Sequence, residues 1–452
     1  MIRVLKENKK TIFLFIFFYI LIFCFNFFRP IDLDLMWNYG FSQNVSKGLI
    51  MYKDFNMVIT PLYPALTGLF MKILGNNMIV FYLINSLYAL LTLIIVYKLD
   101  KKIIFPFFIY FLFDTTPGYN TLTILFTFSL IYLEKNKKSD YLIGFIISLA
   151  FLTKSSIGIF LALPTLYYIR KPKKIIKRII PIIITNIIVI GYFYFNNALF
   201  DYINYAFLGL LDFRSGNGNF NIITIIDFLI VIYIIREYLK TKDFEILYVL
   251  AFMIMAYPLF NISHSLTAII PLVYYLLKKH PKITKLFLKA APIFIIIPIA
   301  SLIINYAICK PRYDDRLFKY RYLQDEYMSD IDALKDYFHN KYDNVYFFLM
   351  ESYLYKLTLD IPINEYDLTL KGNMGYDGEN KMIEKIKKIK KGSIIIVANE
   401  FQETTNEMLK TQASKKIYNY ITNNYSSIGQ FHKFKVYIKW LQNNRQNIKN
   451  SV

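Results

Sequence analysis

The sequence predicts a mainly α-helical membrane protein, with a polytopic bundle of about 11 transmembrane spans followed by a C-terminal extracytoplasmic α/β domain. Apolar residues make up 56% of the 452 residues and gather in long Ile-, Leu- and Phe-rich stretches that no single soluble core of this size needs. After Lys310-Pro311 the composition changes to a charged, mixed sequence. We therefore expect a membrane part over 1–311, an α/β domain over 312–442 and a polar tail over 443–452.

The first span is expected at 11–28. It follows a basic start, as a signal peptide would, but Phe27-Phe28-Arg29-Pro30 stands where a small-residue cleavage site is needed, so an uncleaved helix is predicted. Several later spans are shorter than the roughly 20 residues that cross hydrocarbon unaided, and some are therefore expected to be broken helices. These spans are 77–97, 103–113, 121–133, 141–153, 156–169, 179–197, 222–235, 245–258, 265–277 and 284–308.

The distribution of basic residues sets the predicted orientation. The segments between spans that are assigned to the cytoplasm carry 23 Lys and Arg, and the intervening outer segments carry six. Cytoplasmic loops collect Lys and Arg, so the N-terminus is predicted inside and the C-terminal domain outside a plasma membrane. Residues 61–74 could pass for a span, but a crossing there would place Lys98, Lys101 and Lys102 outside. A juxtamembrane helix on the outer surface is predicted instead.

The formal charge of +21 does not require a nucleic-acid partner. Residues 1–311 carry +17 of it and residues 312–452 carry +4, so most of the excess reflects the topology. The two cysteines, Cys24 and Cys309, lie within the first span and at the end of the last, and neither implies a disulfide.

Strands and helices alternate in the C-terminal region. Helices are expected near 328–340, 351–358, 379–390 and 406–424, and strands at 344–349, 393–398, 427–431 and 434–438. This alternation favours a compact α/β domain.

The first outer loop, residues 29–76, carries the densest functional signals. Asp32 and Asp34 stand two residues apart just past the first span, where a carboxylate stays ionised and accepts a proton from an incoming hydroxyl. Either acid alone is equally well explained as a solubilising loop residue. The neighbouring residues favour a functional role for the two acids, because Trp37, other aromatic residues and two prolines hold the loop close to the bilayer.

A family resemblance rests on this loop. Asp34-x-x-Trp37, Gly48-x-x-x-Tyr52-x-Asp54-Phe55-Asn56 and Pro61-Leu62-Tyr63 resemble the first outer loop of GT-C glycosyltransferases, the family of protein O-mannosyltransferases and lipid A aminoarabinose transferases. The resemblance is specific over 29–75 and loose elsewhere in the membrane part. It implies a polyprenyl-phosphate sugar donor, inversion at the anomeric carbon and an aspartate base. Many relatives have two adjacent acids, whereas Leu35 follows Asp34. Asp34 is the favoured base by its spacing from Trp37, and Asp32 is the alternative.

Such a reaction also needs a cation for the departing phosphate. Lys154 lies in the outer turn of a short helical hairpin, where a lysine facing lipid is costly and usually marks a cavity. A lysine that snorkels to the headgroups is the alternative.

Other groups are predicted on the same side of the membrane. His264 could orient the phosphate or the acceptor, and Arg214 could reach a phosphate through its guanidinium. Asp54 and Asp114 are candidates for an acceptor contact or a second acid. Each of these residues could instead be an ordinary interfacial or loop residue without a catalytic role. Asp227, near the outer end of the eighth span, could instead form a hydrogen bond with a neighbouring helix.

Cofactor signals are sparse in the sequence. The turn-rich run from Gly372 to Gly378 could touch a glycan through its tyrosines, although tight turns alone produce such a run. No His and Cys cluster has metal-ligand spacing. A divalent cation held by Asp32, Asp34 and a headgroup phosphate is an alternative that no motif supports.

The sequence thus predicts a membrane glycosyltransferase acting at the outer face on a glycan, lipid or protein acceptor. A polysaccharide polymerase or ligase is the alternative, although such enzymes rely on arginines in a large outer loop. A transporter is less favoured, because it should show two related halves and none is apparent.

Overall fold

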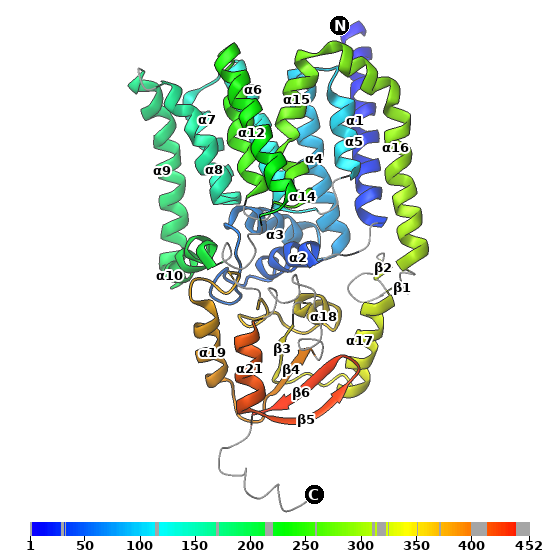
Figure 1. Ribbon diagram of the computed structural model, residues 1–452, viewed down its shortest axis with the longest axis vertical. Coiled ribbons are helices and arrows are strands. Elements are labelled where there is room, and N and C mark those ends of the chain that lie inside the picture. Colours follow the sequence, from blue (N-terminus) through cyan, green and yellow to red (C-terminus); the bar gives the residue numbers. More distant parts are fainter. Residues whose placement is uncertain are drawn as a thin grey trace, which may run out of the picture.

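The structure is a computed structural model. It describes residues 2–28, 31, 33–113, 117–168, 171–212, 220–257, 260–309, 312–313, 322–323, 325–349, 351–369, 372–398 and 414–439. Within these ranges, long helices form a bundle at one end, short helices cross the middle and an α/β part occupies the other end (Figure 1).

A helix lies at each stretch that the sequence predicts as a span. Eight stretches are single helices: α1 (Ile2–Phe28), α4 (Met78–Leu99), α5 (Ile104–Phe113), α6 (Tyr119–Lys135), α7 (Asp140–Thr153), α9 (Pro172–Phe195), α12 (Ile222–Thr241) and α16 (Pro281–Cys309). Three are broken: α8 (Ser155–Ala162) with η1 (Leu163–Tyr168), α13 (Glu245–Phe252) with η3 (Met253–Ala256), and α14 (Ile262–Ala268) with α15 (Ile270–Lys279). Two of these breaks lie at prolines, Pro164 and Pro271. Proline lacks the backbone N–H that a continuous helix needs, so it interrupts the helix there.

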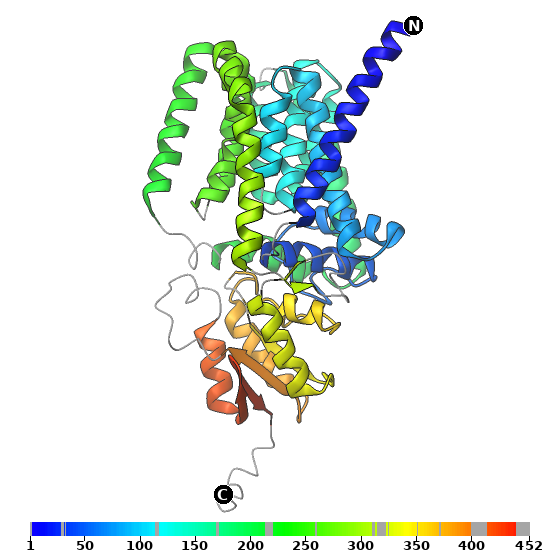
Figure 2. The same cartoon turned by 90° about the vertical axis from the view of Figure 1, so that its right-hand side faces the viewer.

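The surface of the bundle is apolar. By length and composition, three described helices can cross a membrane, Lys9–Phe28, Met78–Leu99 and Pro172–Phe195, and a fourth if the bent pair Pro281–Ala290 and Ile295–Ile304 is one span. The exposed faces of α9, α12 and α16 consist mainly of isoleucine, leucine and aromatic residues, and α12 stands at the margin of the bundle (Figure 2). Lipid rather than water suits such a surface. The eleven-span count and the orientation stay predictions.

A buried ion-pair network holds four helices together at the end of the bundle that carries the basic loops. Arg178 of α9 is 1% exposed and pairs with Glu134 of α6 at 2.5 Å and with Asp140 of α7 at 2.9 Å. Tyr248 of α13 donates a hydrogen bond to Glu134 at 3.1 Å. A Cβ on Gly144 would come within 2.0 Å of the Arg178 carbonyl oxygen, so glycine is what allows α7 and α9 this close.

Neighbouring basic loops are tied together at the same end. Lys135 donates to the Leu99 carbonyl oxygen at 3.3 Å, and Lys278 pairs with Glu245 at 2.6 Å. The segments that the sequence assigns to one side of the membrane therefore do lie together in space.

Short helices cross the far end of the bundle, between it and the α/β part (Figure 1). They are α2 (Leu33–Ser46), α3 (Leu62–Leu74) and α10 (Leu199–Ile203), which continues into the π-helical turn η2 (Asn204–Leu208). The position of α3 agrees with the juxtamembrane helix predicted at 61–74. The helices over 33–46 and 199–208 were not predicted from the sequence. Tertiary packing buries three polar residues of α2, Asn38, Ser42 and Gln43. The sequence of α2 therefore lacks the periodic apolar pattern that predicts an amphipathic helix.

The C-terminal part is built on a four-stranded sheet with strand order β3-β4-β6-β5. Its strands are β3 (Val345–Phe348), β4 (Ile394–Ala398), β5 (Ser426–Phe431) and β6 (Phe434–Ile438), and β3 and β4 are parallel while the other pairs are antiparallel. Its helices are α17 (Asp325–Phe338), α18 (Ser352–Thr358), α19 (Gly378–Lys388) and α21 (Lys415–Asn424). A separate short pair joins β1 (Arg312–Tyr313) to β2 (Tyr322–Leu323). These elements match the α/β pattern predicted from the sequence, apart from 406–413, which lie outside the described residues.

The core of the bundle continues into one face of this sheet. Ile396 of β4 belongs to the same buried cluster as the bundle helices, whereas Ile395 and Val397 belong to a second core under α19 and α21. Tyr353 of α18 packs at 5.6 Å on the ring of Phe41 in α2. A Cβ at Gly40 would come within 2.4 Å of the Tyr353 ring. Helix α2, which carries Asp34, thus packs between the bundle and the α/β part.

Candidate active site

Asp34 lies in the first turn of α2, and its side chain is exposed although most of the helix is buried. The positive end of the helix dipole stabilises an ionised carboxylate at this position. Asn38, one turn later and 4% exposed, donates from Nδ2 to the Asp34 carbonyl oxygen at 2.7 Å. The fold thus presents Asp34 as an anchored, accessible carboxylate.

Lys154 is the single residue between α7 and α8, and its side chain is half-buried. A Cβ on Gly158 would come within 2.2 Å of the Phe151 Cα, so glycine lets α8 fold back closely on α7. Burial lowers the pKa of the Lys154 ammonium to about 8, although the nearby Asp34 carboxylate acts in the opposite direction. The hairpin turn therefore holds a partly desolvated cation within electrostatic reach of Asp34.

Tyr119 joins these two groups. It is the first residue of α6, its ring centroid lies 5.5 Å from Lys154 Nζ, and it interacts electrostatically with Asp34. The preceding Gly118 packs on Asn38, where a Cβ would come within 2.8 Å of Nδ2. The start of α6 is therefore fitted directly against α2.

Polar atoms with unused hydrogen-bonding capacity lie in the same segments. Trp37 Nε1, Asn38 Oδ1 and Asn120 Oδ1 are buried and have no hydrogen-bond partner within the described ranges. Buried polar groups are nearly always paired, and leaving one unpaired costs about 1–3 kcal/mol. A polar ligand beside Asp34 would relieve this cost.

His264 completes the group from α14. The Asn261 amide oxygen accepts hydrogen bonds from the His264 backbone N–H and from Nδ1, both at 2.9 Å. Because that oxygen only accepts, the proton sits on Nδ1 and leaves Nε2 as an acceptor. Burial, followed by the charge of Lys154, lowers the pKa of His264 to about 4. A neutral imidazole of this kind suits an acceptor hydroxyl better than a phosphate.

The structure thus brings three of the predicted residues, Asp34, Lys154 and His264, into one electrostatic cluster. Sequence reasoning missed Tyr119 and Asn38. Tyr119 lies in a polar segment between two predicted spans. Its position next to the start of a predicted helix was the one feature of the sequence that could have pointed to it. Asn38 lies one helical turn from Asp34, but this spacing carries meaning only once 33–46 is known to be helical.

The remaining candidates lie elsewhere or cannot be placed. Asp54 Oδ2 accepts a hydrogen bond from the Ile50 N–H at 2.6 Å, so this carboxylate closes its own turn. Asp32, Arg214 and Asp114 lie outside the described residues. Within the described residues, no group of three or more His, Cys, Asp or Glu could hold a metal ion.

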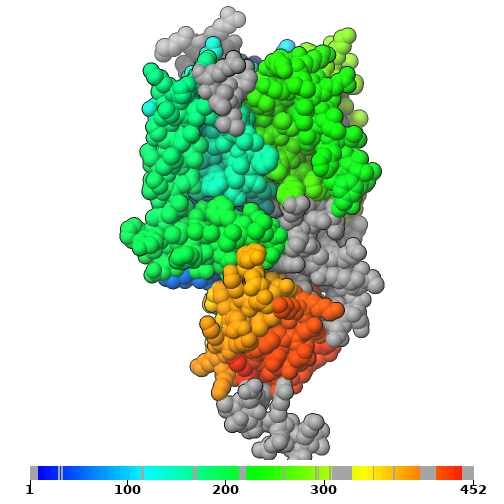
Figure 3. All heavy atoms as spheres, turned by 60° about the vertical axis from the view of Figure 1, so that its left-hand side comes forward, coloured from blue at the N-terminus to red at the C-terminus, as the bar shows by residue number. Residues whose placement is uncertain are grey.

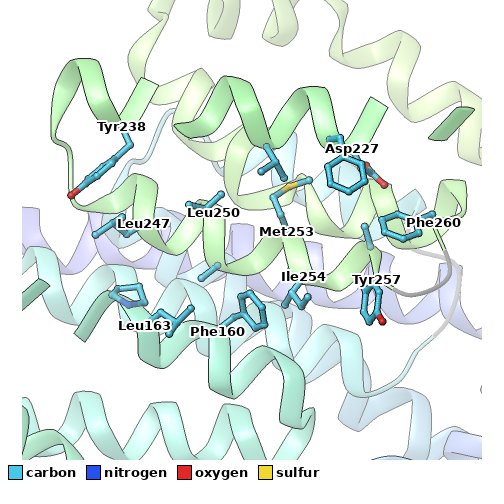
Figure 4. Close-up of a pocket in the computed structure, with 15 residues that line it drawn as sticks. Phe160, Leu163, Asp227, Tyr238, Leu247, Leu250, Met253, Ile254, Tyr257 and Phe260 are labelled. Atoms are coloured by element: carbon cyan, nitrogen blue, oxygen red, sulfur yellow. The ribbon is translucent and has the colours of Figure 1, made fainter. Parts of the chain in front are cut away.

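An apolar cavity of about 620 Å³ lies among the helices of the bundle. Its lining comes from α8 and η1, from α12, and from the segment that runs from α13 to Phe260 (Figure 4). Asp227 is the one charged residue among the described residues that line it. Asp227 accepts from Ser265 at 2.6 Å across to α14, which is the neighbouring-helix contact foreseen as the alternative for this residue. Phe260 borders the cavity four residues before His264, and Phe160 borders it six residues after Lys154. The cavity therefore shares α8 with the turn that holds Lys154, and Phe260 precedes the helix that carries His264.

Comparison with known proteins gives a fold but no sequence relative. No family model and no curated protein matches the chain. Among solved structures, ArnT from Cupriavidus metallidurans bound to undecaprenyl phosphate is similar with a TM-score of 0.54 and 9% identity, covering 95% of this chain and 98% of that one. The Archaeoglobus fulgidus oligosaccharyltransferase in complex with zinc and sulfate gives a TM-score of 0.44 and 10% identity, over 94% of this chain and 73% of that one. The likeness to ArnT confirms the GT-C fold that the sequence predicted.

Proposed function

We propose that this chain, which has the GT-C fold, transfers a sugar from a polyprenyl-phosphate donor to a hydroxyl acceptor at the outer face of a cell membrane. ArnT, whose fold it shares, was solved with undecaprenyl phosphate bound. The observation that carries the proposal is the cluster of Asp34, Lys154 and Tyr119, together with an apolar cavity lined in part by α8, the helix that begins after Lys154.

The apolar cavity suits the hydrocarbon part of the donor. Asp227 and Tyr238 line it eleven residues apart on α12, which corresponds to about 16 Å along the helix axis. An elongated apolar space of this length accepts several isoprene units, because burying apolar surface is favourable wherever water would otherwise cover it. The donor phosphate would then lie at the outer end of the cavity, on the side of Lys154 and His264.

Lys154 would serve the leaving group. As the bond between the anomeric carbon and the phosphate oxygen breaks, the electron pair moves onto that oxygen and negative charge grows there. A cation held in a partly desolvated turn stabilises this charge more strongly than water does. Since its pKa is about 8, Lys154 is mainly protonated at neutral pH.

Asp34 would serve as the base. It takes the proton of the acceptor hydroxyl while the acceptor oxygen forms its bond to the anomeric carbon, on the face opposite the leaving phosphate, and the centre is inverted. His264 Nε2 and Asn38 Oδ1 would accept hydrogen bonds from sugar hydroxyls, since neither atom is committed to a hydrogen bond among the described residues. Asp32 as an assisting acid stays part of this proposal.

The direct test is transfer of radiolabelled sugar from a panel of polyprenyl-phosphate monosaccharides by purified protein. Asp34→Asn should lower transfer about 10²- to 10⁴-fold, the usual contribution of a general base. Asp54→Asn is the comparison variant, because Asp54 is a further acid of the same loop and its carboxylate closes its own turn.

Donor binding separates the roles of the two residues in this test. Asp34→Asn should keep its affinity for the donor, since the base acts on the acceptor. Equal transfer by the wild type and Asp34→Asn, or a larger loss in Asp54→Asn than in Asp34→Asn, would refute Asp34 as the base. Folded wild-type protein that transfers from no donor would refute the function.

A further inference from the structure

A second cavity, of about 350 Å³, lies away from the apolar one and is polar. It lies where the segment that follows α9 meets the α/β part. Its polar lining includes Asp212, Tyr376, Asp377, Glu379, Asn380 and Lys416. Figure 3 shows this border from outside, with the green spheres of the α10 region against the orange spheres of the α/β part. The chemistry of Asp34 and Lys154 makes no use of this cavity.

The cavity is built by specific contacts between the two parts of the chain. The Asp377 N–H donates to Asp212 Oδ2 at 2.8 Å, and the Tyr376 N–H donates to Asn204 Oδ1 at 3.1 Å. Gly375 has a φ of +80°, and a Cβ there would come within 2.3 Å of Asn204 Nδ2. The turn-rich run from Gly372 to Gly378 therefore packs closely on the π-helical turn that contains Asn204. A π-helical turn is rare and often lies at a functional site.

The charges of the lining select the kind of ligand. Asp212, Asp377 and Glu379 contribute three carboxylates, against the one ammonium of Lys416. This excess of negative charge disfavours phosphate and uronic acids, since like charges repel. Carboxylate and amide oxygens accept hydrogen bonds from hydroxyl groups, which a neutral sugar presents in number.

An aromatic surface adds the second element of sugar recognition. Tyr376 borders the cavity and is 48% exposed, an unusual exposure for a large aromatic side chain in the α/β part. An exposed ring offers an apolar face on which the C–H face of a pyranose can pack while the sugar hydroxyls reach the polar groups around it.

We propose that this cavity binds a neutral glycan and so holds the acceptor of the transferase. The proposal rests on the proposed function for the word acceptor, but not for the binding itself. Asp212 and Asn221 are nine residues apart, so at most about 32 Å of extended chain separates them. Asn221 donates to the Phe260 carbonyl oxygen at 3.2 Å, beside the segment that carries His264. The length of this segment limits the separation between the cavity and the segment that carries His264, and we propose that the bound glycan reaches from one to the other.

A cationic peptide is the other class that three carboxylates could attract. The glycan is favoured because one wall is an exposed tyrosine and because Lys416, whose ammonium donates to Asn380 Oδ1 at 2.5 Å, lies within the lining. Lys416 offsets one of the three carboxylates and so weakens the attraction for a basic peptide.

Ligand-observed saturation-transfer NMR on the full chain in nanodiscs tests the proposal. The probes are neutral hexose and N-acetylhexosamine oligosaccharides, a uronic-acid oligosaccharide of the same length and a lysine-rich peptide. Tyr376→Ala should weaken neutral-glycan binding about tenfold, or about 1.4 kcal/mol, and Tyr376→Phe should retain it. Glu379→Gln should weaken binding, whereas Glu384→Gln, the matched change on the same helix at an exposed glutamate paired with Lys387, should not.

The outcomes separate this proposal from the proposed function. Neutral-glycan binding that depends on Tyr376 supports the cavity even where no sugar transfer is measured, and that result would count against the transferase alone. Transfer to a small soluble acceptor without any glycan binding would overturn the cavity proposal alone. Preference for the uronic-acid probe or for the peptide, or equal binding by wild type and Tyr376→Ala, would also overturn it.

Discussion

Replacing Lys154 by methionine should make the protein more stable and inactive at once. The folded state lowers the pKa of this ammonium from its ordinary value of 10.5 to about 8 because the hairpin turn buries it. This difference corresponds to about 3 kcal/mol by which folding disfavours the charged form. Methionine has a similar length and no charge, so Lys154→Met should remove most of that cost.

The pH dependence of this stabilisation follows from the sign of the pKa change. Between pH 8 and 10.5 the unfolded chain binds more protons at this residue than the folded chain does, so wild-type stability rises with pH across that window. Below pH 8 the cost is fully present, and toward pH 10.5 it disappears. The stability advantage of Lys154→Met should therefore be largest at neutral pH and should shrink as pH rises above 8.

Thermal unfolding in nanodiscs, followed across this pH range, provides the measurement. Lys53→Met is the control, because Lys53 lies in the first outer loop, is exposed and donates to the Asn196 carbonyl oxygen. It should leave the unfolding temperature unchanged. A lower unfolding temperature for Lys154→Met at neutral pH would refute the desolvation of this lysine.

Transfer assays complete the test of Lys154. Lys154→Met should lower transfer about 10²- to 10³-fold, the usual loss when a group that stabilises transition-state charge is removed. Wild-type transfer should fall as pH rises through about 8. Lys154→Arg should keep its activity to higher pH because the guanidinium stays protonated. Undiminished transfer by Lys154→Met would refute the role in phosphate stabilisation.

Three further predictions follow from the packing. Ala251→Phe, which fills the apolar cavity, should weaken binding of long-chain donors more than of short-chain ones, as measured by competition with polyprenyl phosphates of different length. Arg178→Met should destabilise the bundle by about 3–5 kcal/mol, because Glu134 and Asp140 lose their buried partner, and unfolding of the purified variant measures this. Gly118→Ala should lower transfer with little loss of stability, because its Cβ would displace the Asn38 amide beside Asp34, and parallel transfer and unfolding assays distinguish the two effects.

Local sequence patterns predicted the helices well because a membrane helix depends on its own composition. Long apolar runs satisfy their backbone hydrogen bonds internally, so a helix lies at every predicted span. Charge also carried information: Lys135 and Lys278, assigned to the same side, lie among ion pairs and hydrogen bonds at one end of the bundle. The helix over 33–46 was missed, because Asn38, Ser42 and Gln43 are polar residues that only neighbouring elements bury.

The candidate site shows the same division. Lys154 was selected because a lysine that faces lipid is costly and usually marks a cavity, and Asp34 was selected by its spacing from Trp37 in the first outer loop. The sequence did not show that Asp34 and Lys154 form a cluster with Tyr119 and His264. These four residues come from α2, α6, the α7–α8 turn and α14, which are far apart along the chain. The protonation of His264 likewise depends on the Asn261 contact and on burial.

The sequence by itself determined that this is a helical membrane protein with an α/β C-terminal part, and it pointed to Asp34 and Lys154, because apolar runs, charge placement and local motifs act over a few residues. Tertiary structure alone decided which polar groups meet. It joined the core of the bundle to the sheet through Tyr353, and it built the polar cavity from Asp212 and Asp377, 165 residues apart. Contacts of this kind depend on how distant surfaces fit together, and no local period in the sequence records that fit.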